Sequence, residues 1–353
     1  MSDPIVAVTG LNRGENPQPG YAVVRSLRRF FPRMTIIGMI YDAMESGIFA
    51  VDGPDWAYLI PYPSSGAKAY LDRLDVIRKE HPIEILIPTL DTEIEMMIRL
   101  EPELTARGIR SFLPTLDTFR ARGKPVLDKL CESCGCATPR TELASELADA
   151  ERAAEILGYP LMVKGSFYDA KLVHDEEDLG KAFGEILRKW GAPLLLQKRI
   201  RGGEFNVMGV GDGHGGVTGL CTVRKTIVSS QGKGISSVVL REPRLEAITL
   251  RIVERLKWRG PFELELMHDE EDDSFRIIEM NPRFPAWVDF PSAFGLNFPA
   301  QIVALLTGGQ VDPCIEVPAG RFFLRHQIEL IGSVEDLAHL MTEGVRQAQR
   351  SGS

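Results

Sequence analysis

The sequence lacks a long hydrophobic run. No apolar stretch approaches the roughly 20 residues that a helix needs to cross a bilayer, so no membrane is expected among the partners. The N-terminal segment MSDPIVAVTG carries an acid where a secretory signal peptide carries basic residues, and its apolar run is short. These two features predict a cytoplasmic protein.

The chain also lacks an excess of positive charge. Its 41 Lys and Arg residues are outnumbered by 49 Asp and Glu residues, so the formal net charge is −8. Proteins that bind nucleic acids need cations to neutralise the phosphate backbone, and no nucleic acid is expected as a partner here. Local basic groups remain able to bind the phosphates of a small ligand.

Histidine and cysteine are scarce, and neither forms a recognisable catalytic set. The six histidines show no metal-ligand spacing, and we interpret His268 and His326 as surface or packing residues. Cys131, Cys134 and Cys136 form a C-x-x-C-x-C cluster, but a structural zinc site takes four ligands and no second Cys/His pair lies nearby. We interpret these cysteines as reduced residues near the end of a helix, with metal or redox use as the alternative.

The first third of the chain alternates strand-like and helix-like patterns. With 353 residues, two or three domains are expected. The apolar runs IVAVTG, MTIIGMIYD and IEILIP are separated by amphipathic helical segments, a pattern that predicts a parallel sheet with right-handed crossovers. Ligands of such sheets bind beyond the carboxyl ends of the strands, so the loops at 10–20 and 88–93 are expected to face a cleft. The loop GLNRGENPQPG lacks G-x-G-x-x-G, and a simple flexible connection remains the alternative.

Two carboxylates and an amide are expected at one place late in the chain. The segment GPFELELMHDEEDDSFRIIEMNP is typical of two antiparallel strands joined by an acidic turn. Glu265 and Glu279 lie equally far from the centre of this turn, and Asn281 points to the same face as Glu279. Opposed acids destabilise a sheet by up to roughly 1 kcal/mol, a conflict that hard cations such as Mg²⁺ remove. The alternative is that one of the acids faces solvent.

Two lysines and an arginine stand where phosphates would need them. Lys164 follows the apolar run Leu161–Val163, so its side chain is expected to be half-buried, which is costly without an anion. Lys124 precedes a helix, and Arg283 offers a planar fork of donors that suits a phosphate.

In this order, Lys124, Lys164, LLLQKRIRGGEFNV, Glu265 and EMNPR resemble the ATP-grasp superfamily, in particular its carbamoyl-phosphate-synthase-like carboxylate–amine ligases. The resemblance covers most of the chain, and EMNPR with its upstream glutamate is its most specific motif. It implies an α/β protein, with a parallel-sheet, Rossmann-like pre-ATP-grasp domain at 1–114 followed by a two-subdomain ATP-grasp fold. The small subdomain is expected at 115–195, with the phosphate-contacting lysines, and the large subdomain at 196–353, with the metal site.

The resemblance also implies a role for particular residues. ATP would contact Lys124 and Lys164 through its phosphates, and the adenine would lie along the backbone of Gln197, Lys198, Arg199 and Ile200. Glu204 would meet the ribose or help to position that segment. Mg²⁺, or Mn²⁺ in its place, would be held by Glu265, Glu279 and Asn281. Candidates for contact with the transferring phosphoryl group or the substrate are Arg283, Arg224 and Lys233, although the last two fit a charged hairpin edge equally well.

One segment departs from the family pattern. Family members commonly follow the second lysine with a Gly-rich loop that closes over the phosphates, whereas this chain has Gly165 and Ser166 followed by the bulky Phe167 and Tyr168. Backbone N–H groups of residues 165–168 would still suit a phosphate.

The implied activity is an ATP-dependent ligase. It would activate a small-molecule or peptide carboxylate as an acyl phosphate and pass the acyl group to an amine, or to a thiol, with release of ADP and phosphate. An ATP-grasp kinase and a non-catalytic nucleotide-binding module are the alternatives. Trp287 and Phe290 are expected either to shape the acceptor pocket or simply to pack. A homodimer is left open, and so is whether the C-terminal residues from about 318 complete the grasp domain.

Overall fold

The computed structural model describes residues 3–12, 14, 16–165, 169–229, 232–312 and 315–348, and the chain divides into two compact units. The first unit contains Met1–Arg120, Asn206–Glu263 and Asn281–Ser353, and the second contains Ala121–Phe205 and Leu264–Met280. The expected domain boundaries after residues 114 and 195 stay predictions.

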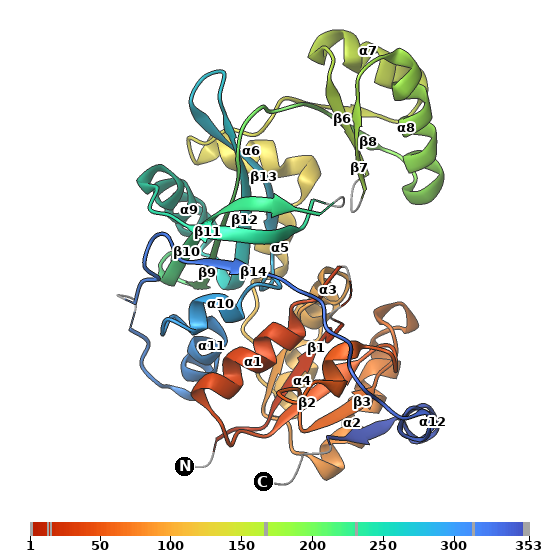
Figure 1. Ribbon diagram of the computed structural model, residues 1–353, viewed down its shortest axis with the longest axis vertical. Helices are drawn as coiled ribbons and strands as arrows, with labels where there is room; N and C mark the ends of the chain where they lie inside the picture. The colour runs from red at the N-terminus through yellow and green to blue at the C-terminus, as the bar shows by residue number, and fades with distance from the viewer. Residues whose placement is uncertain are drawn as a thin grey trace. The chain divides into compact units, whose positions relative to one another are not determined.

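A five-stranded sheet forms the N-terminal part of the first unit, in the order β15-β3-β2-β1-β4 (Figure 1). Strand β1 pairs in parallel with β2 and β4, and β2 pairs in parallel with β3, so the expected parallel sheet is confirmed. Strand β15 joins the edge antiparallel to β3, which the sequence pattern did not indicate. The strands are β1 (Val6–Thr9), β2 (Ile36–Ile40), β3 (Trp56–Leu59), β4 (Ile85–Ile87) and β15 (Val345–Gln347).

Alternate residues of these strands enter two separate cores, because successive side chains of a strand point to opposite faces. Val6 and Val8 of β1 pack in one core with residues of α1, whereas Ala7 packs in the other with residues of α2 and α3. Burial on both faces explains why these strands are apolar throughout rather than alternating. The helices are α1 (Gly20–Phe30), α2 (Ala67–Glu80) and α3 (Asp91–Arg99).

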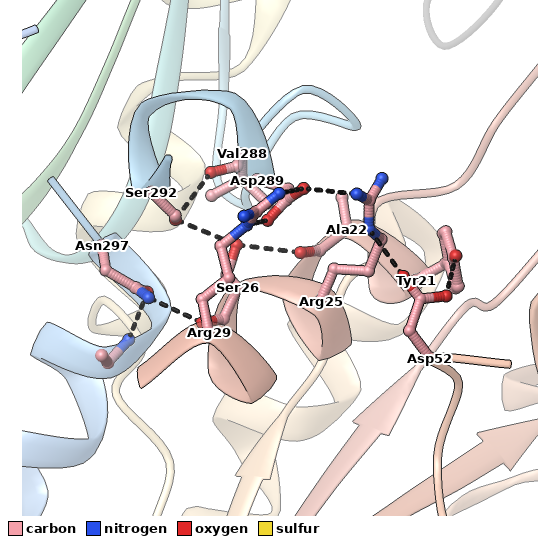
Figure 2. Close-up of polar contacts among 11 residues, drawn as sticks. Tyr21, Ala22, Arg25, Ser26, Arg29, Asp52, Val288, Asp289, Ser292 and Asn297 are labelled. Carbon is pink, nitrogen blue, oxygen red and sulfur yellow. Dashed lines mark hydrogen bonds and ion pairs between the residues drawn. The ribbon is translucent and has the colours of Figure 1, made fainter. Parts of the chain in front are cut away.

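Helix α1 packs against two later helices of the same unit, α10 (Asp289–Ser292) and α11 (Phe298–Thr307). The Asp289 carboxylate, 12% exposed, accepts from Arg29 Nε at 2.7 Å and lies 3.4 Å from an Arg25 nitrogen (Figure 2). Asn297 begins α11 by accepting from the backbone of Ala300, and its Nδ2 donates to the Ser26 carbonyl at 2.6 Å. These contacts join the N-terminal residues to the segment that follows the EMNPR motif.

A six-stranded sheet follows the order β13-β12-β9-β10-β11-β14, in which β12 and β13 are the expected antiparallel hairpin. The first part of β12 and the end of β13 belong to the first unit, and the rest of the hairpin belongs to the second. The elements are β9 (Glu204–Asp212), β10 (Val217–Val228), β11 (Gly234–Val239), α9 (Pro243–Leu256), β12 (Arg259–Asp269), β13 (Ser274–Asn281) and β14 (Phe322–Leu324).

The second unit contains a four-stranded antiparallel sheet in the order β5-β8-β6-β7. Two helices, α7 and α8, pack against it around a core of alanine, leucine and other apolar side chains (Figure 1). The elements are β5 (Thr141–Ala144), α7 (Leu147–Leu157), β6 (Leu161–Lys164), β7 (Ala170–Val173), α8 (Glu176–Trp190) and β8 (Leu194–Lys198).

The remaining helices are short connectors: α4 (Glu101–Ala106), α5 (Leu116–Ala121), α6 (Leu127–Ser133) and α12 (Val334–Glu343). Three further segments are turns of 3₁₀ helix: Ser46–Phe49, Pro63–Ser65 and Lys124–Val126. Across the described residues, no helix combines the length and apolar character required for a membrane span. Cys131 and Cys134 are buried at the end of α6 and form no disulfide, and burial raises the pKa of Cys131 to about 12, so this thiol is protonated at neutral pH.

Candidate functional site

The two predicted metal-binding acids lie on neighbouring strands. Glu265 is on β12 and Glu279 on β13, and both side chains are half-buried. Lys124, at the 3₁₀ turn before α6, places its Nζ 3.3 Å from Glu279 Oε1. A predicted phosphate ligand and a predicted metal ligand are therefore in contact within the second unit.

Lys164, at the end of β6, lies close to the same groups. Burial is the main reason that the pKa of Lys164 is lowered to about 8, and the Lys124 ammonium lowers it as well. Three carboxylates oppose this effect: Glu279, Glu265 and Glu204. Because such electrostatic effects act over short distances in a protein, the structure brings these five predicted site residues together.

Gln197, the first residue of the predicted adenine segment, positions Lys164. Its Oε1 accepts from Lys164 Nζ at 2.6 Å, and its Nε2 donates to the Thr141 hydroxyl at 3.0 Å. The side chain of Gln197 is thus occupied within the sheet. Its neighbours differ in exposure: Lys198 reaches Glu271 of the hairpin turn at 3.0 Å, Arg199 is exposed, and Ile200 is buried.

A glycine turn holds the predicted adenine segment against the β12–β13 hairpin. Gly202 passes so close to the hairpin that a Cβ atom would lie 1.9 Å from the His268 carbonyl oxygen. The neighbouring backbone groups make two hydrogen bonds there: His268 N–H donates to Gly203 at 2.9 Å, and Glu270 N–H donates to Arg201 at 3.0 Å. Only glycine fits this approach, which explains Gly202, the first glycine of the pair before β9.

Asn281, the third predicted metal ligand, is buried in the first unit at the end of β13. Its Nδ2 donates to Glu263 Oε2 at 3.2 Å. Glu263, which is 4% exposed, also accepts from Asn206 Nδ2 at 2.7 Å and from Trp287 Nε1 at 2.9 Å. A carboxylate can only accept hydrogen bonds. The Asn281 side chain therefore turns its Nδ2 toward Glu263, and its Oδ1 points away from Glu263.

The sequence interpretation missed Glu263, although a signal was present. Glu263 and Glu265 are two residues apart in FELEL, so the period of a strand places both on one face. Only Glu265 was assigned a role, because it alone stands opposite Glu279.

The three predicted basic residues of the first unit have different surroundings. Arg283 donates from Nε to Asp91 Oδ2 at 2.8 Å, and Asp91 begins α3, whose first residues form the second half of the expected loop at 88–93. Arg224 on β10 and Lys233 before β11 are exposed. The roles of Arg283, Arg224 and Lys233 toward a phosphoryl group stay predictions.

The loop after Lys164 lies largely outside the described residues, since 166–168 are not among them. Gly165 N–H donates to the Asp169 carbonyl at 3.1 Å, which extends the pairing of β6 with β7 by one hydrogen bond. The expected phosphate contacts of 165–168 stay a prediction.

The carboxyl ends of β1, β2 and β4 meet at an edge filled by the protein's own polar groups. Glu93, fully buried, accepts from the backbone N–H groups of Thr89 at 2.7 Å and Leu90 at 2.9 Å, and from the hydroxyls of Thr9 and Tyr41. Burial raises the pKa of Glu93 although these hydrogen bonds lower it. This network supports the loops at 10–20 and 88–93, whose ligand role stays a prediction.

The chemistry of these residues fits a magnesium nucleotide. The carboxylates of Glu265 and Glu279 in the second unit are the kind of ligands that Mg²⁺ takes together with phosphate and water, and the part of the Asn281 amide in such a site stays a prediction. Two ammonium groups beside them suit the phosphates. Among the described residues, no three His, Cys, Asp or Glu side chains gather as a metal site.

Three comparisons show what the chain is similar to. The family model described as carbamoyl-phosphate synthase L chain, ATP binding domain, matches residues 124–287. The C-terminal section of the carbamoyl phosphate synthase large chain of Methanopyrus kandleri is 27% identical over 238 residues, which cover 63% of this chain and 43% of that protein. The D-alanine–D-alanine ligase of Stutzerimonas stutzeri is 26% identical over 231 residues, which cover 57% of this chain and 68% of the ligase.

A solved structure gives the same fold. The biotin carboxylase domain of the Hydrogenobacter thermophilus 2-oxoglutarate carboxylase, bound to MgADP and bicarbonate, superposes with a TM-score of 0.65 at 20% identity, covering 88% of this chain and 70% of that one. The chain spans less than half the length of the carbamoyl phosphate synthase sections that it matches.

The matched family segment begins at Lys124 and ends at Trp287, so it contains both lysines, the β12–β13 hairpin and the EMNPR motif. All the residues that carry the ATP-grasp resemblance thus lie in the segment that matches this family model, and the predicted ATP-grasp relationship is confirmed.

Proposed function

We propose that the protein is an ATP-dependent ligase that activates a carboxylate as an acyl phosphate and transfers the acyl group to an amine. The observation that carries the proposal is the gathering of Lys124, Lys164, Glu265 and Glu279 in one unit. The similarity to a D-alanine–D-alanine ligase supports the carbon–nitrogen bond.

The residues would divide the work by charge. Glu265, Glu279 and Asn281 would hold Mg²⁺, which would supply positive charge to neutralise the phosphates. Lys124 and Lys164 would bind phosphate oxygens of ATP from the protein side. Phosphoryl transfer depends mainly on alignment and charge neutralisation, which explains why the chain needs no Ser-His-Asp or Cys-His set.

The proposed reaction has two steps, phosphorylation of the carboxylate and transfer of the acyl group to the amine. A carboxylate oxygen of the substrate attacks the γ-phosphorus of ATP, the bond from that phosphorus to the β–γ bridging oxygen breaks, and ADP leaves. The amine then attacks the carbonyl carbon of the acyl phosphate, phosphate leaves with the former carboxylate oxygen, and the amine loses a proton. Gln197 holds Lys164 in place for the first step.

Phosphate release from Mg-ATP tests this function. The purified protein is given amino acids, dipeptides, simple carboxylates and bicarbonate, each alone and together with amines or thiols as acceptors. Bicarbonate is included because the carboxylase domain of the same fold binds it. The proposal predicts release only when one acid and one acceptor are present together.

Two other results would redirect the assignment. Release of ADP with a single substrate, leaving a stable phosphorylated product, would identify a kinase. Tight binding of Mg-ADP without turnover on any pair would contradict the ligase and indicate a nucleotide-binding module.

A further inference from the structure

An arginine outside the matched family segment lies in an unusual environment. Arg325 follows β14, and its backbone N–H continues the pairing with β11 by donating to Ile235 at 2.9 Å. Its side chain is partly buried, with Cζ 5.6 Å from the centre of the Phe323 ring. Within the described part of the chain, its guanidinium makes no hydrogen bond or ion pair.

Burial lowers the pKa of Arg325 below its ordinary value, and the negative charge of Glu263 partly opposes that effect. An arginine stays charged at any ordinary pH, so the desolvation is a standing cost to the folded protein. Such a cost is offset when an anion with two oxygens meets the planar guanidinium fork.

Three aromatic rings pack together, and one of them, Phe323, lies beside this guanidinium. Phe323 stacks on Trp287, with ring centres 6.2 Å apart and planes 14° apart, and its centre lies 5.4 Å from that of Phe290. We define Trp287, Phe290 and Phe323 as the aromatic wall. Trp287 donates to Glu263 at 2.9 Å, and Glu263 accepts from Asn281, so the wall adjoins a predicted metal ligand.

We propose that Arg325 anchors the carboxylate of an organic substrate whose apolar body packs against the aromatic wall. Arg325 and the three residues of the aromatic wall all belong to the first unit. The inference rests on the proposed function, because it identifies the substrate class of the ligase as carboxylates with an aromatic or aliphatic body. It also gives Trp287 and Phe290 a role that the sequence left open between a pocket and simple packing.

Glu263 restricts the expected class of carboxylate substrates further. Its carboxylate accepts from Asn206, Asn281 and Trp287, and its negative charge acts on Arg325 at longer range. A substrate ammonium on the Glu263 side would be favoured by that charge, and a second carboxylate would be disfavoured. Apolar α-amino acids are therefore expected to bind better than dicarboxylic acids.

Equilibrium binding without ATP tests the proposal by calorimetry or ligand-observed NMR. The probes are L-phenylalanine, 3-phenylpropanoate, which keeps the carboxylate but lacks the amine, and L-phenylalaninamide, which lacks the carboxylate. Wild-type protein is expected to bind the two carboxylates and to bind the amide at least about 10-fold more weakly, since a charge-assisted hydrogen bond contributes about 1.5–3 kcal/mol. Arg325→Met should lose about 10–100-fold in affinity for the carboxylates, and Arg325→Lys should recover part of it.

Arg241→Met is the matched control. Arg241 is exposed and pairs with Glu316 on the surface of the same unit, so this variant should bind the probes as wild type does. Binding of Mg-ADP is measured on every variant, and it should stay unchanged because Arg325 is placed at the organic substrate.

The proposal is overturned if Arg325→Met binds the carboxylates as well as wild type, if the amide binds as tightly as the acid, or if wild type binds neither carboxylate at millimolar concentration. Failure of the ligase function gives a different pattern, in which carboxylates bind through Arg325 but no acid and acceptor pair releases phosphate from Mg-ATP.

Discussion

Glu279→Gln should reduce Mg-ATP-dependent phosphate release by at least about 100-fold. Partners that only orient a metal ligand typically contribute 10–100-fold to affinity or activity, and Glu279 is placed as a ligand itself. The substitution keeps the size of the side chain and removes its charge, so metal affinity falls while the strand retains its shape. Titration with Mn²⁺ in the presence of ADP, followed by electron paramagnetic resonance, measures the loss directly.

The folded state should tolerate this substitution. The Lys124–Glu279 pair is partly exposed, at 21% and 28%, so its loss costs about 0–1 kcal/mol, and the repulsion between Glu265 and Glu279 is relieved at the same time. Glu270→Gln, on the exposed turn of the same hairpin, is the control and should leave activity within about twofold. Full activity of Glu279→Gln would contradict the proposal that Glu279 is a metal ligand.

Lys164→Met should weaken the binding of Mg-ATP by about 10–100-fold, because a hydrogen bond to a charged group contributes about 1.5–3 kcal/mol. The pKa of Lys164 is lowered to about 8, first by burial and then by Lys124. Affinity for Mg-ATP should therefore fall as the pH rises through about 8 and the ammonium loses its proton. Lys164→Arg keeps the charge and should flatten this part of the pH profile.

The same pKa has a consequence for stability with the opposite sign. The pKa of an unfolded lysine is about 10.4, so between pH 8 and that value the unfolded chain binds more protons at this position than the folded protein. The contribution of Lys164 to the free energy of unfolding should consequently increase as the pH rises through this window. Chemical denaturation of wild type and Lys164→Met at two pH values measures the difference in the free energy of unfolding.

The binding prediction has its own contradicting outcome. An affinity of wild type for Mg-ATP that stays constant from pH 7 to 9 would contradict the assignment of Lys164 as a phosphate ligand.

Local periodicity was sufficient to predict much of the fold. The apolar strands β1, β2 and β4 are buried on both faces, and this burial is visible as continuous apolar runs in the sequence. The hairpin was visible from its alternation and its acidic turn, and the pairing of β12 with β13 follows from the turn alone. The positions of Glu265 and Glu279 on adjacent strands were predictable for the same reason.

Contacts between distant segments were not predictable in this way. Arg283 pairs with Asp91, which lies 192 positions earlier, and nothing local to either residue indicates the other. Strand β15 joins the N-terminal sheet from the far end of the chain. Arg325 directly follows the short strand β14, and the packing of Phe323 against Trp287, which no local pattern indicates, places it near Glu263.

The transfer of a carboxylate oxygen to phosphate tests the central claim most directly. A mixture of apolar amino acids labelled with ¹⁸O in both carboxyl oxygens is incubated with the protein, Mg-ATP and the acceptor found in the substrate panel, and the released phosphate is analysed by mass spectrometry. An acyl phosphate intermediate predicts one ¹⁸O atom in each phosphate, because the attacking carboxylate oxygen leaves with phosphorus when the amine attacks carbon. Release of unlabelled phosphate during product formation would contradict carboxylate activation by phosphoryl transfer.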